Sequence, residues 1–375
     1  MNSIYDIQTL EKLIRDPHKR KRFLNAYIKK ALPPEECPEP ASQFSQTLEL
    51  LERHDSKTDG ATKLVFKCLE NKKGAGSACR VEAVILRIAS GRTSLCISSQ
   101  IGCAADCQFC ATGSMGFIRN LTAAEMLDQV LLAKRLLREE GRTLRNVVVM
   151  GMGEPLHNEE NLFQCLETLR DPRFFNLSER HLMVSTVGVP DAMVRFAERF
   201  PGIQLALSLH SARQEVREQL MPIAKFQTLE KLKAVFSRVG TLKATTHPGL
   251  RPPLPGRGSL EIPSVGGVPE RRGGFSDSSR NDNSTRKSFM IEYLMLKGIN
   301  DGPEDLEALK EFLRGTDAHI NLIQFNAHPG GKYQPVTLEE RKAFGDALKN
   351  AGFKVTLRYS LGEDIAAACG QLAGK

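Results

Sequence analysis

Residues 93–110 read TSLCISSQIGCAADCQFC and contain the pattern from which the fold is predicted. The run Thr93–Ser98 is rich in apolar residues and predicts a strand. A CxxxCxxC pattern, Cys103, Cys107 and Cys110, follows it directly. Loops after parallel strands are where α/β barrels carry their chemistry. Three thiolates on one short loop can bind three irons of a cubane cluster and leave the fourth iron open to another ligand.

Two other interpretations of these cysteines stay open. A structural zinc site normally has a fourth protein ligand, and the nearest candidate, Cys96, lies on the predicted strand. Free thiols are the other alternative. Both leave the position of the cysteines after a strand unexplained, so we favour the iron–sulfur cluster. With nine cysteines and no apolar signal core at the N-terminus, a disulfide framework is not expected.

Outward from this stretch, the chain repeats strand, loop and helix. The further predicted strands are Val147–Gly151, Leu182–Thr186, Gln204–Leu209, Phe289–Leu294, Ile320–Phe325 and Val355–Tyr359. Amphipathic helices separate them, and the first, Thr122–Arg138, opens with the capping-box pair Thr122 and Glu125. Later helices are expected to begin near Thr228, at Pro303 and near Thr337. Six such units before a last strand predict an α/β fold, an open partial (βα)6 barrel.

The rest of the chain predicts two smaller parts. Residues 1–60 have helical spacing and a basic run at 19–22, which is either a solvated helix face or a contact to nucleic acid. Residues 61–90 predict a β-hairpin connector. The barrel then occupies 91–375. Its proline- and glycine-rich stretch 246–287 predicts a disordered insertion.

Composition limits the classes of protein that this chain can be. Its 375 residues are 41% hydrophobic and 26% charged, so it can bury a core and is not wholly disordered. No run of about 18 apolar residues is present, so we expect no membrane-spanning helix. The net charge of +8 suits a polyanionic partner without proving one.

Six motifs in order resemble one known family. They are CISSQIGCAADCQFCATGSMGFIRNL, VMGMGEPLHN, VSTVGVP, LALSLHSA, LIQFNAHPG and DIAAACGQLAG. The set is similar to the radical S-adenosylmethionine (SAM) enzymes, and within them to the dual-specificity methyltransferases that act on carbon 2 of adenine in large-subunit ribosomal RNA and in transfer RNA. The resemblance spans residue 80 to the end of the chain, apart from the insertion, and is weaker in the helical N-terminus.

The resemblance implies two sets of cofactor residues. Cys103, Cys107 and Cys110 would bind a [4Fe-4S] cluster. The implied contacts to SAM are Gly153, Glu154, Ser185, Ser208, Leu209, His210 and Asn326. A Ser-His hydrolase interpretation of Ser208 and His210 fails, because no nucleophile elbow surrounds them.

The resemblance also implies two reactive thiols and a base. Cys369 would receive a methyl group from one of two SAM molecules used per turnover, and Cys96 would later attack it and form a disulfide. Glu82 matches the position of the base that removes the ring proton, with an exposed hairpin carboxylate as the alternative. Carbon 2 of adenine is electrophilic, so it needs attack by a radical rather than by a methyl cation.

We therefore expect a SAM-dependent RNA methyltransferase whose partner is ribosomal RNA, with transfer RNA left open as a second one. We also expect an electron donor such as a flavodoxin or ferredoxin. The protein is expected to be a monomer and to be cytoplasmic, or to lie in an organelle if the source is eukaryotic. The rivals are the sister activity at carbon 8 of the same base, a catalytically silent RNA-binding relative, and a structural zinc protein.

Overall fold

The computed structural model describes residues 3–69, 79–245, 289–327 and 331–373. The predicted insertion at 246–287 lies outside these residues. So does the turn expected between the two hairpin strands. All statements below concern the part of the chain that the structure describes.

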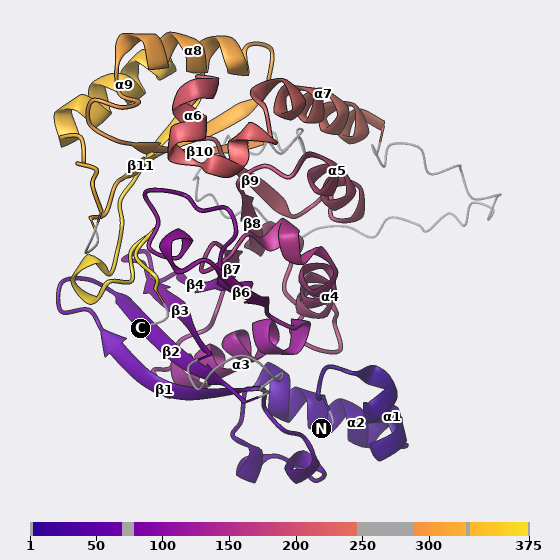
Figure 1. The fold of residues 1–375 in the computed structure, drawn as a ribbon. Helices are drawn as coiled ribbons and strands as arrows, with labels where there is room; N and C mark the ends of the chain where they lie inside the picture. The colour runs from indigo at the N-terminus through magenta and orange to yellow at the C-terminus, as the bar shows by residue number, and fades with distance from the viewer. Residues whose placement is uncertain (1–2, 70–78, 246–288, 328–330, 374–375) are drawn as a thin grey trace, which may run out of the picture.

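One curved sheet of ten strands runs through the molecule in the order β1-β2-β3-β4-β7-β8-β9-β10-β11-β12 (Figure 1). Strands β4 and β7 to β12 are all parallel to their neighbours in that series. Their bounds are β4 (Thr93–Ile97), β7 (Asn146–Val149), β8 (Leu182–Thr186), β9 (Gln204–Ser208), β10 (Phe289–Met295), β11 (Ala318–Gln324) and β12 (Lys354–Arg358). The predicted barrel strands are therefore confirmed, and no end differs from its prediction by more than two residues.

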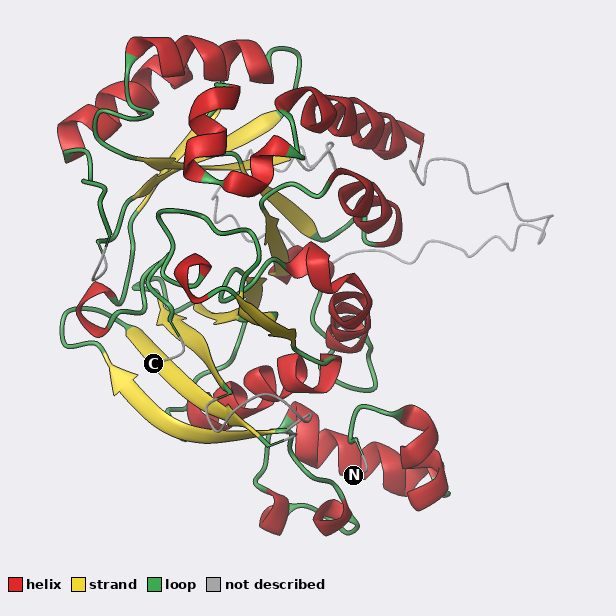
Figure 2. Ribbon diagram, viewed as in Figure 1, coloured by secondary structure: helices red, strands yellow, loops and turns green. Residues whose placement is uncertain are grey.

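Six helical connections join these parallel strands, as predicted. Their helices are α3 (Ala123–Glu139), α4 (Glu159–Arg170), α5 (Pro190–Arg199), α6 (Gln214–Leu220) with α7 (Leu229–Thr245), α8 (Pro303–Leu313) and α9 (Leu338–Asn350). Figure 2 shows α3, α4, α5, α8 and α9 along the outer side of the curved sheet. The expected capping box is present at α3, where the Thr122 hydroxyl accepts from the Glu125 backbone and the Glu125 carboxylate accepts from the Thr122 backbone. The fold is thus an open α/β barrel, because β12 pairs only with β11 among the described strands.

Three antiparallel strands extend the sheet beyond β4. Strand β2 (Ala61–Cys68) and strand β3 (Arg80–Arg87) form the expected hairpin pair, with Val65 opposite Glu82. Strand β1 (Leu48–Asp55) pairs with β2. The helical spacing expected up to residue 60 is wrong for these eight residues, because pairing with β2 provides the backbone hydrogen bonds that a helix would otherwise make.

The N-terminal helices α1 (Ile7–Leu13) and α2 (Pro17–Leu24) pack beside α3. The Tyr5 hydroxyl donates to the buried carboxylate of Asp128 on α3 over 2.7 Å, and Thr47 donates to the other oxygen of that carboxylate. These contacts attach the start of the chain to the barrel. The division into accessory, connector and barrel domains stays a prediction.

Candidate cofactor site

A glycine-dependent turn starts the cysteine loop. After β4 the chain forms β5 (Gln100–Gly102), which pairs with β6 (Phe117–Asn120) on the far side of the loop. Gly102 has a φ of +70°, and a Cβ atom there would lie 1.8 Å from the carbonyl oxygen of Gly116. The Cys103 backbone N–H donates to that same oxygen over 2.9 Å. The two ends of the loop are therefore closed on each other.

Two distant segments fix the middle of the loop. The Gln108 N–H donates to the carbonyl of Leu220 at the end of α6 over 2.9 Å. On the other side, the Ala111 N–H donates to the carbonyl of Gly370 over 2.8 Å, and the Thr112 hydroxyl donates to the carbonyl of Leu372 over 2.6 Å. The cysteine loop therefore lies between α6 and the C-terminal segment that contains Cys369.

The three thiols of the loop are packed in an apolar cluster with residues such as Phe109 and Leu220. Burial raises the pKa of Cys103 to about 12 and that of Cys107 well above its usual value, and the neighbouring thiols act in the same direction. In the described part of the chain, no three His, Cys, Asp or Glu side chains converge on a single metal ion. Thiolates that each bind a different iron of a cubane need no such convergence, and binding removes the proton that burial otherwise retains. The donor set fits a cluster.

Glu154 lies beyond the end of β7 and is 2% exposed. Its carboxylate accepts hydrogen bonds from the Leu156 N–H, the Thr186 hydroxyl and the Val187 N–H at 2.9, 2.7 and 2.8 Å. Burial still raises the pKa of this carboxyl to about 7. Its position is set by Gly153, whose φ is +100° and whose added Cβ would lie 2.5 Å from Gln100. A carboxylate with two acceptor sites on each oxygen keeps capacity for a further donor.

Ser185 and Ser208 come together at the ends of neighbouring strands. Their hydroxyl oxygens are 3.1 Å apart. Ser208 pairs in register with Glu292 of β10, a buried carboxylate whose Oε1 accepts from Asn321 over 3.1 Å and whose Oε2 has no hydrogen bond. Polar side chains from β8, β9, β10 and β11 are therefore present along neighbouring strands of the sheet.

His210 and Leu209 occupy positions that differ from those of the serines. The Leu209 side chain is buried in the core. His210 has a φ of +57°, and its Nδ1 accepts from the Leu294 N–H over 3.0 Å. Its ring meets the ring of Phe109 edge-on at 4.9 Å, and burial lowers its pKa to about 3. His210 is therefore neutral and supports the cysteine loop through Phe109.

Asn326 is 1% exposed and lies just beyond β11. Its Nδ2 donates to the carbonyl of Cys369 over 3.1 Å, while its Oδ1 is buried without a partner. Buried polar atoms in proteins nearly always have a partner. The orphaned oxygen therefore fits a ligand that brings a donor, such as the amino or hydroxyl group of a nucleoside cofactor.

Cys96 and Cys369, which the sequence places 273 residues apart, lie near each other. Burial raises the pKa of Cys96 to about 12, and a negative charge on Cys369 raises it further. Cys369 is exposed, yet the surrounding protein limits its solvation and raises its pKa to about 11. A negative charge on Cys110 of the loop also raises the pKa of Cys369, so the C-terminal thiol lies near both Cys96 and the cysteine loop.

A half-buried arginine that sequence reasoning missed lies near this thiol pair. Arg358, at the end of β12, lowers the pKa of both Cys96 and Cys369. Its Nη1 lies 3.8 Å from Glu292 Oε2 and 3.9 Å from the sulfur of Met150. The available signal in the sequence was Glu292, the one charged residue in the otherwise apolar strand FMIEYLM.

Glu82 lies on β3, on the inner side of the hairpin, and is 1% exposed. Its Oε2 accepts from the Ala373 N–H over 3.2 Å, and its Oε1 is 3.9 Å from the Lys63 ammonium nitrogen. The alternative of an exposed hairpin carboxylate is wrong, because the C-terminal segment covers this side chain. Glu82 therefore lies near the segment that contains Cys369.

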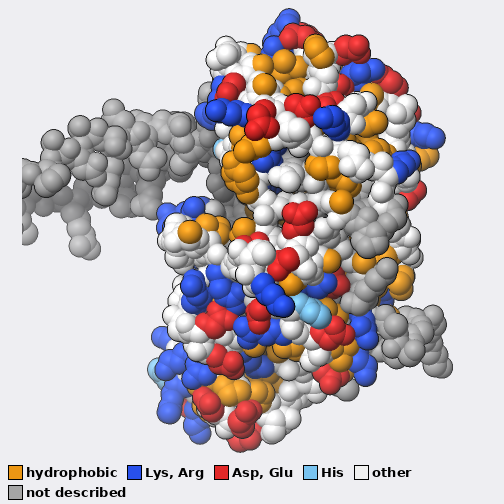
Figure 3. Space-filling model, turned by 90° about the vertical axis from the view of Figure 1, so that its left-hand side faces the viewer, with side chains coloured by type: hydrophobic (Ala, Val, Ile, Leu, Met, Phe, Trp, Pro, Cys, Tyr) orange, Lys and Arg blue, Asp and Glu red, His pale blue; other side chains and the backbone are white. Residues whose placement is uncertain are grey.

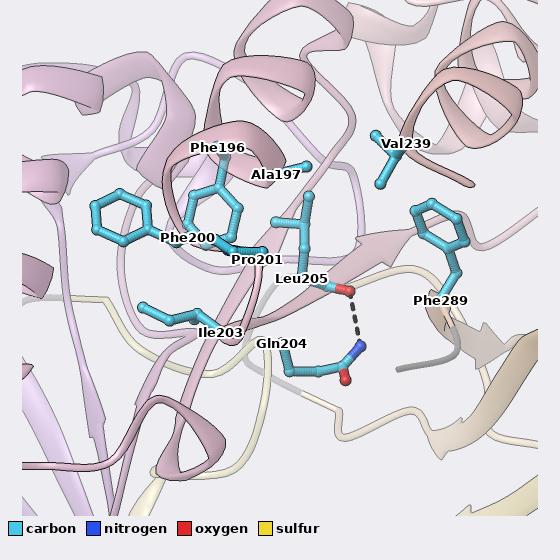
Figure 4. A pocket seen from close by; sticks show the side chains of 9 residues that line it. All are labelled: Phe196, Ala197, Phe200, Pro201, Ile203, Gln204, Leu205, Val239 and Phe289. Carbon is cyan, nitrogen blue, oxygen red and sulfur yellow. Dashed lines mark hydrogen bonds between the residues drawn. The ribbon is translucent and has the colours of Figure 1, made fainter. Parts of the chain in front are cut away.

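The cavity in Figure 4 lies away from these residues. It opens near the first residues of β9 and β10, at the opposite strand ends from the cysteine loop. Its lining is almost wholly apolar and consists of Phe196, Ala197, Phe200, Pro201, Ile203, Gln204, Leu205, Val239 and Phe289. The amide of Gln204 donates to the neighbouring Leu205 carbonyl. This cavity has no group suited to the predicted chemistry.

The face of the molecule in Figure 3 carries charges of both signs. On the face in Figure 3, lysine and arginine side chains lie among acidic ones and form no field of a single sign.

None of the described helices has the length and apolarity needed to cross a bilayer.

Comparisons with known proteins agree with this geometry. The model of the radical SAM superfamily matches residues 97–251. The chain is 43% identical over 331 residues to a probable RNA methyltransferase of Rhodopirellula baltica, covering 87% of this chain and 73% of that protein. It is 38% identical over 287 residues to the dual-specificity RNA methyltransferase RlmN of Ruthia magnifica, covering 76% and 68%. A crystal structure of a radical SAM methyltransferase from Sphaerobacter thermophilus matches all of both chains with a TM-score of 0.81 at 28% identity.

Proposed function

Since the chain belongs to the RlmN-like family of radical SAM RNA methyltransferases, we propose that it methylates carbon 2 of adenine in large-subunit ribosomal RNA, with transfer RNA as a second substrate. The family implies a [4Fe-4S] cluster and SAM. The observation that carries the proposal is the proximity of Cys96 and Cys369 beside the cysteine loop. A radical enzyme that does not carry a methyl group on sulfur needs no pair of thiols in addition to its three cluster cysteines.

In this proposal Cys103, Cys107 and Cys110 hold the cluster. Gly153, Glu154, Ser185, Ser208, Leu209, His210 and Asn326 would be the residues that bind SAM or border it. When bound and reduced, the cluster supplies the electron that cleaves SAM to a 5′-deoxyadenosyl radical. An external protein such as a flavodoxin or ferredoxin would supply that electron.

The residues of the chain then move one carbon. Cys369 would carry the methyl group as a thioether and lose one hydrogen atom from it to the 5′-deoxyadenosyl radical, and the resulting carbon radical would bond to carbon 2 of the adenine. The adduct would then give up one electron to the oxidised electron-transfer centre and its ring proton to Glu82, which restores the aromatic ring. The Cys96 thiolate attacks the Cys369 sulfur, the sulfur–carbon bond breaks, and the released carbon takes up a proton to become the methyl group of the product. One SAM methylates Cys369 and a second SAM provides the radical, so two are used per turnover.

Arg358 supports the last step in this scheme. The Cys96 thiol must ionise in that step, because thiolates rather than thiols are the nucleophiles, and burial raises its pKa to about 12. Arg358 lowers this pKa and so increases the fraction of Cys96 thiolate. It also lowers the pKa of Cys369, which has to ionise earlier, before it is methylated.

The test is the Cys369→Ala variant, with iron and sulfide content, 5′-deoxyadenosine formation and RNA methylation measured on the same anaerobic preparation. We expect the cluster and SAM cleavage to remain and methyl transfer to be abolished. Cys96→Ala should accumulate protein covalently attached to RNA. The control is Cys165→Ala, a buried thiol on α4 outside the site, which should keep methyl transfer.

Nucleoside mass analysis separates the proposal from its rivals. A product with the methyl group at carbon 8 alone would replace carbon 2 as the target. Protein that is colourless and contains zinc would contradict the assignment of Cys103, Cys107 and Cys110 to an iron–sulfur cluster. Methylation that persists without iron, or without both Cys96 and Cys369, would overturn the whole scheme.

A further inference from the structure

Arg217 on α6 is a fully buried cation, with 0% of its surface exposed. Its Nη1 donates to the Gln227 carbonyl over 2.8 Å and its Nη2 donates to the Val187 carbonyl over 2.6 Å. Its Nε has no hydrogen-bond partner. Among the described residues, no carboxylate forms an ion pair with it, although buried charges in proteins are normally paired.

The Cys107 thiol lies close to Arg217; it is neutral while protonated and becomes an anion when it binds iron. The Arg217 guanidinium itself stays charged at neutral pH. The other titratable side chain under its influence, His210, is neutral. Glu154, which also acts on Cys107, has its carboxylate oxygens bonded to residues 156, 186 and 187. No other described side chain therefore supplies the missing counter-charge.

Packing holds this arrangement in place. Val216 and Leu220 of α6 lie in one apolar cluster with Cys107 and Phe109, and the Leu220 carbonyl accepts from the Gln108 N–H. The guanidinium is further tied to the segment after β8 through Val187. Arg217 is consequently held at a set position relative to the cysteine loop, in surroundings that screen its charge poorly.

We propose that Arg217 is a positioning residue that acts through the iron–sulfur cluster, where its fixed positive charge favours the reduced state and raises the reduction potential. Reduction adds one negative charge to the cluster, and a nearby cation in an apolar environment stabilises that charge. The inference rests on the proposed assignment of Cys103, Cys107 and Cys110 to the cluster.

The test compares two variants of Arg217 with a surface control. Arg217→Gln removes the charge and keeps amide donors for a carbonyl, whereas Arg217→Lys keeps the charge. Arg213→Gln makes the same change of net charge at the start of α6, where Arg213 forms ion pairs with Glu215 and Glu304. The readout is a redox titration of the reconstituted cluster, followed by the electron paramagnetic resonance signal of its reduced form.

We expect Arg217→Gln to lower the ratio of reduced to oxidised cluster at a fixed potential about tenfold, which is a shift of about 59 mV for one electron. Arg217→Lys and Arg213→Gln should stay close to the unsubstituted protein. An unchanged midpoint in Arg217→Gln with full iron and sulfide content would overturn the proposal.

If Arg217→Gln fails to hold the cluster, Arg217→Lys decides the question. Retention in the lysine variant supports a requirement for charge. Loss in both variants contradicts it, because the residue would then act only by bridging two carbonyls. A wild-type protein that binds no iron–sulfur cluster would instead refute the proposed function, so the two failures are distinguishable.

Discussion

The side chain of Asn326 donates from Nδ2 to the backbone carbonyl of Cys369 over 3.1 Å, while its Oδ1 is buried without a partner. One end of the amide therefore holds the segment with the reactive thiol, and the other end faces the interior of the site. This relationship connects the binding of a cofactor to the placement of Cys369 through one side chain.

Asn326→Ala should therefore weaken both SAM binding and the anchoring of the C-terminal segment. We expect a loss of about 1–3 kcal/mol in the free energy of unfolding, because the Cys369 carbonyl loses its donor. The matched control is Gln371→Ala, since Gln371 anchors the same segment to the Ala327 carbonyl over 2.7 Å and has no orphaned atom. Equilibrium dialysis of SAM with reconstituted protein should show weaker binding only for Asn326→Ala. Equal weakening in both variants would contradict a contact between Oδ1 and SAM.

Alkylation of Cys96 should depend steeply on pH. Because burial raises the pKa of this thiol to about 12, its rate of reaction with a small alkylating reagent should rise about tenfold for each pH unit between neutral pH and that value. Arg358→Met should slow the reaction. Cys369→Ser should accelerate it above about pH 11, where the Cys369 thiol ionises, since the charges of these two neighbours shift the pKa of Cys96 in opposite directions. Peptide mass mapping after timed labelling measures the rate. A labelling rate that levels off near neutral pH would contradict the raised pKa of Cys96. A change of rate in the same direction in both variants would contradict the opposite effects of Arg358 and Cys369.

Glu154 should make the cluster-free protein less stable as the pH rises. Burial raises the pKa of its carboxyl from 4.5 to about 7, so the folded state favours the protonated form. The resulting stabilisation is complete below about pH 4.5, and about 3 kcal/mol of it is lost as the pH rises through about 7. Urea unfolding at about pH 5 and about pH 8 should show this loss in the wild type and not in Glu154→Gln. Parallel pH profiles for the two proteins would show that the carboxyl is not shifted.

Gly153→Ala should cost far more stability than Gly141→Ala, although both glycines have positive φ angles of +100° and +66°. An added Cβ at Gly153 would lie 2.5 Å from Gln100, whereas Gly141 has no heavy atom within 4 Å. We expect a loss of about 2–5 kcal/mol at Gly153 and about 1 kcal/mol at Gly141, measured by urea unfolding. Similar losses at both positions would mean that the contact with Gln100 can relax freely.

Local patterns were enough to predict most elements of the barrel. The capping box at Thr122 and the strand Leu182–Thr186 appear where the sequence places them, because caps and apolar runs act through residues that are close in the chain. The edge strand Leu48–Asp55 was missed, since it is mostly exposed and exists through its pairing with β2. Helix α6 was also missed. It has only seven residues, and its middle is the buried Arg217.

The sequence by itself determined the spacing of Cys103, Cys107 and Cys110 on a loop after a strand, because ligand spacing is a property of a few consecutive residues. The family resemblance implied that Cys96 reacts with Cys369, and the tertiary structure brings the two thiols near each other. Only the tertiary structure decided that the C-terminal segment covers Glu82, and that Arg217 and Arg358 lie near thiols. The physical reason is that burial and charge pairing depend on the groups that surround a side chain in space. Those groups come from strands and loops that lie far apart along the chain.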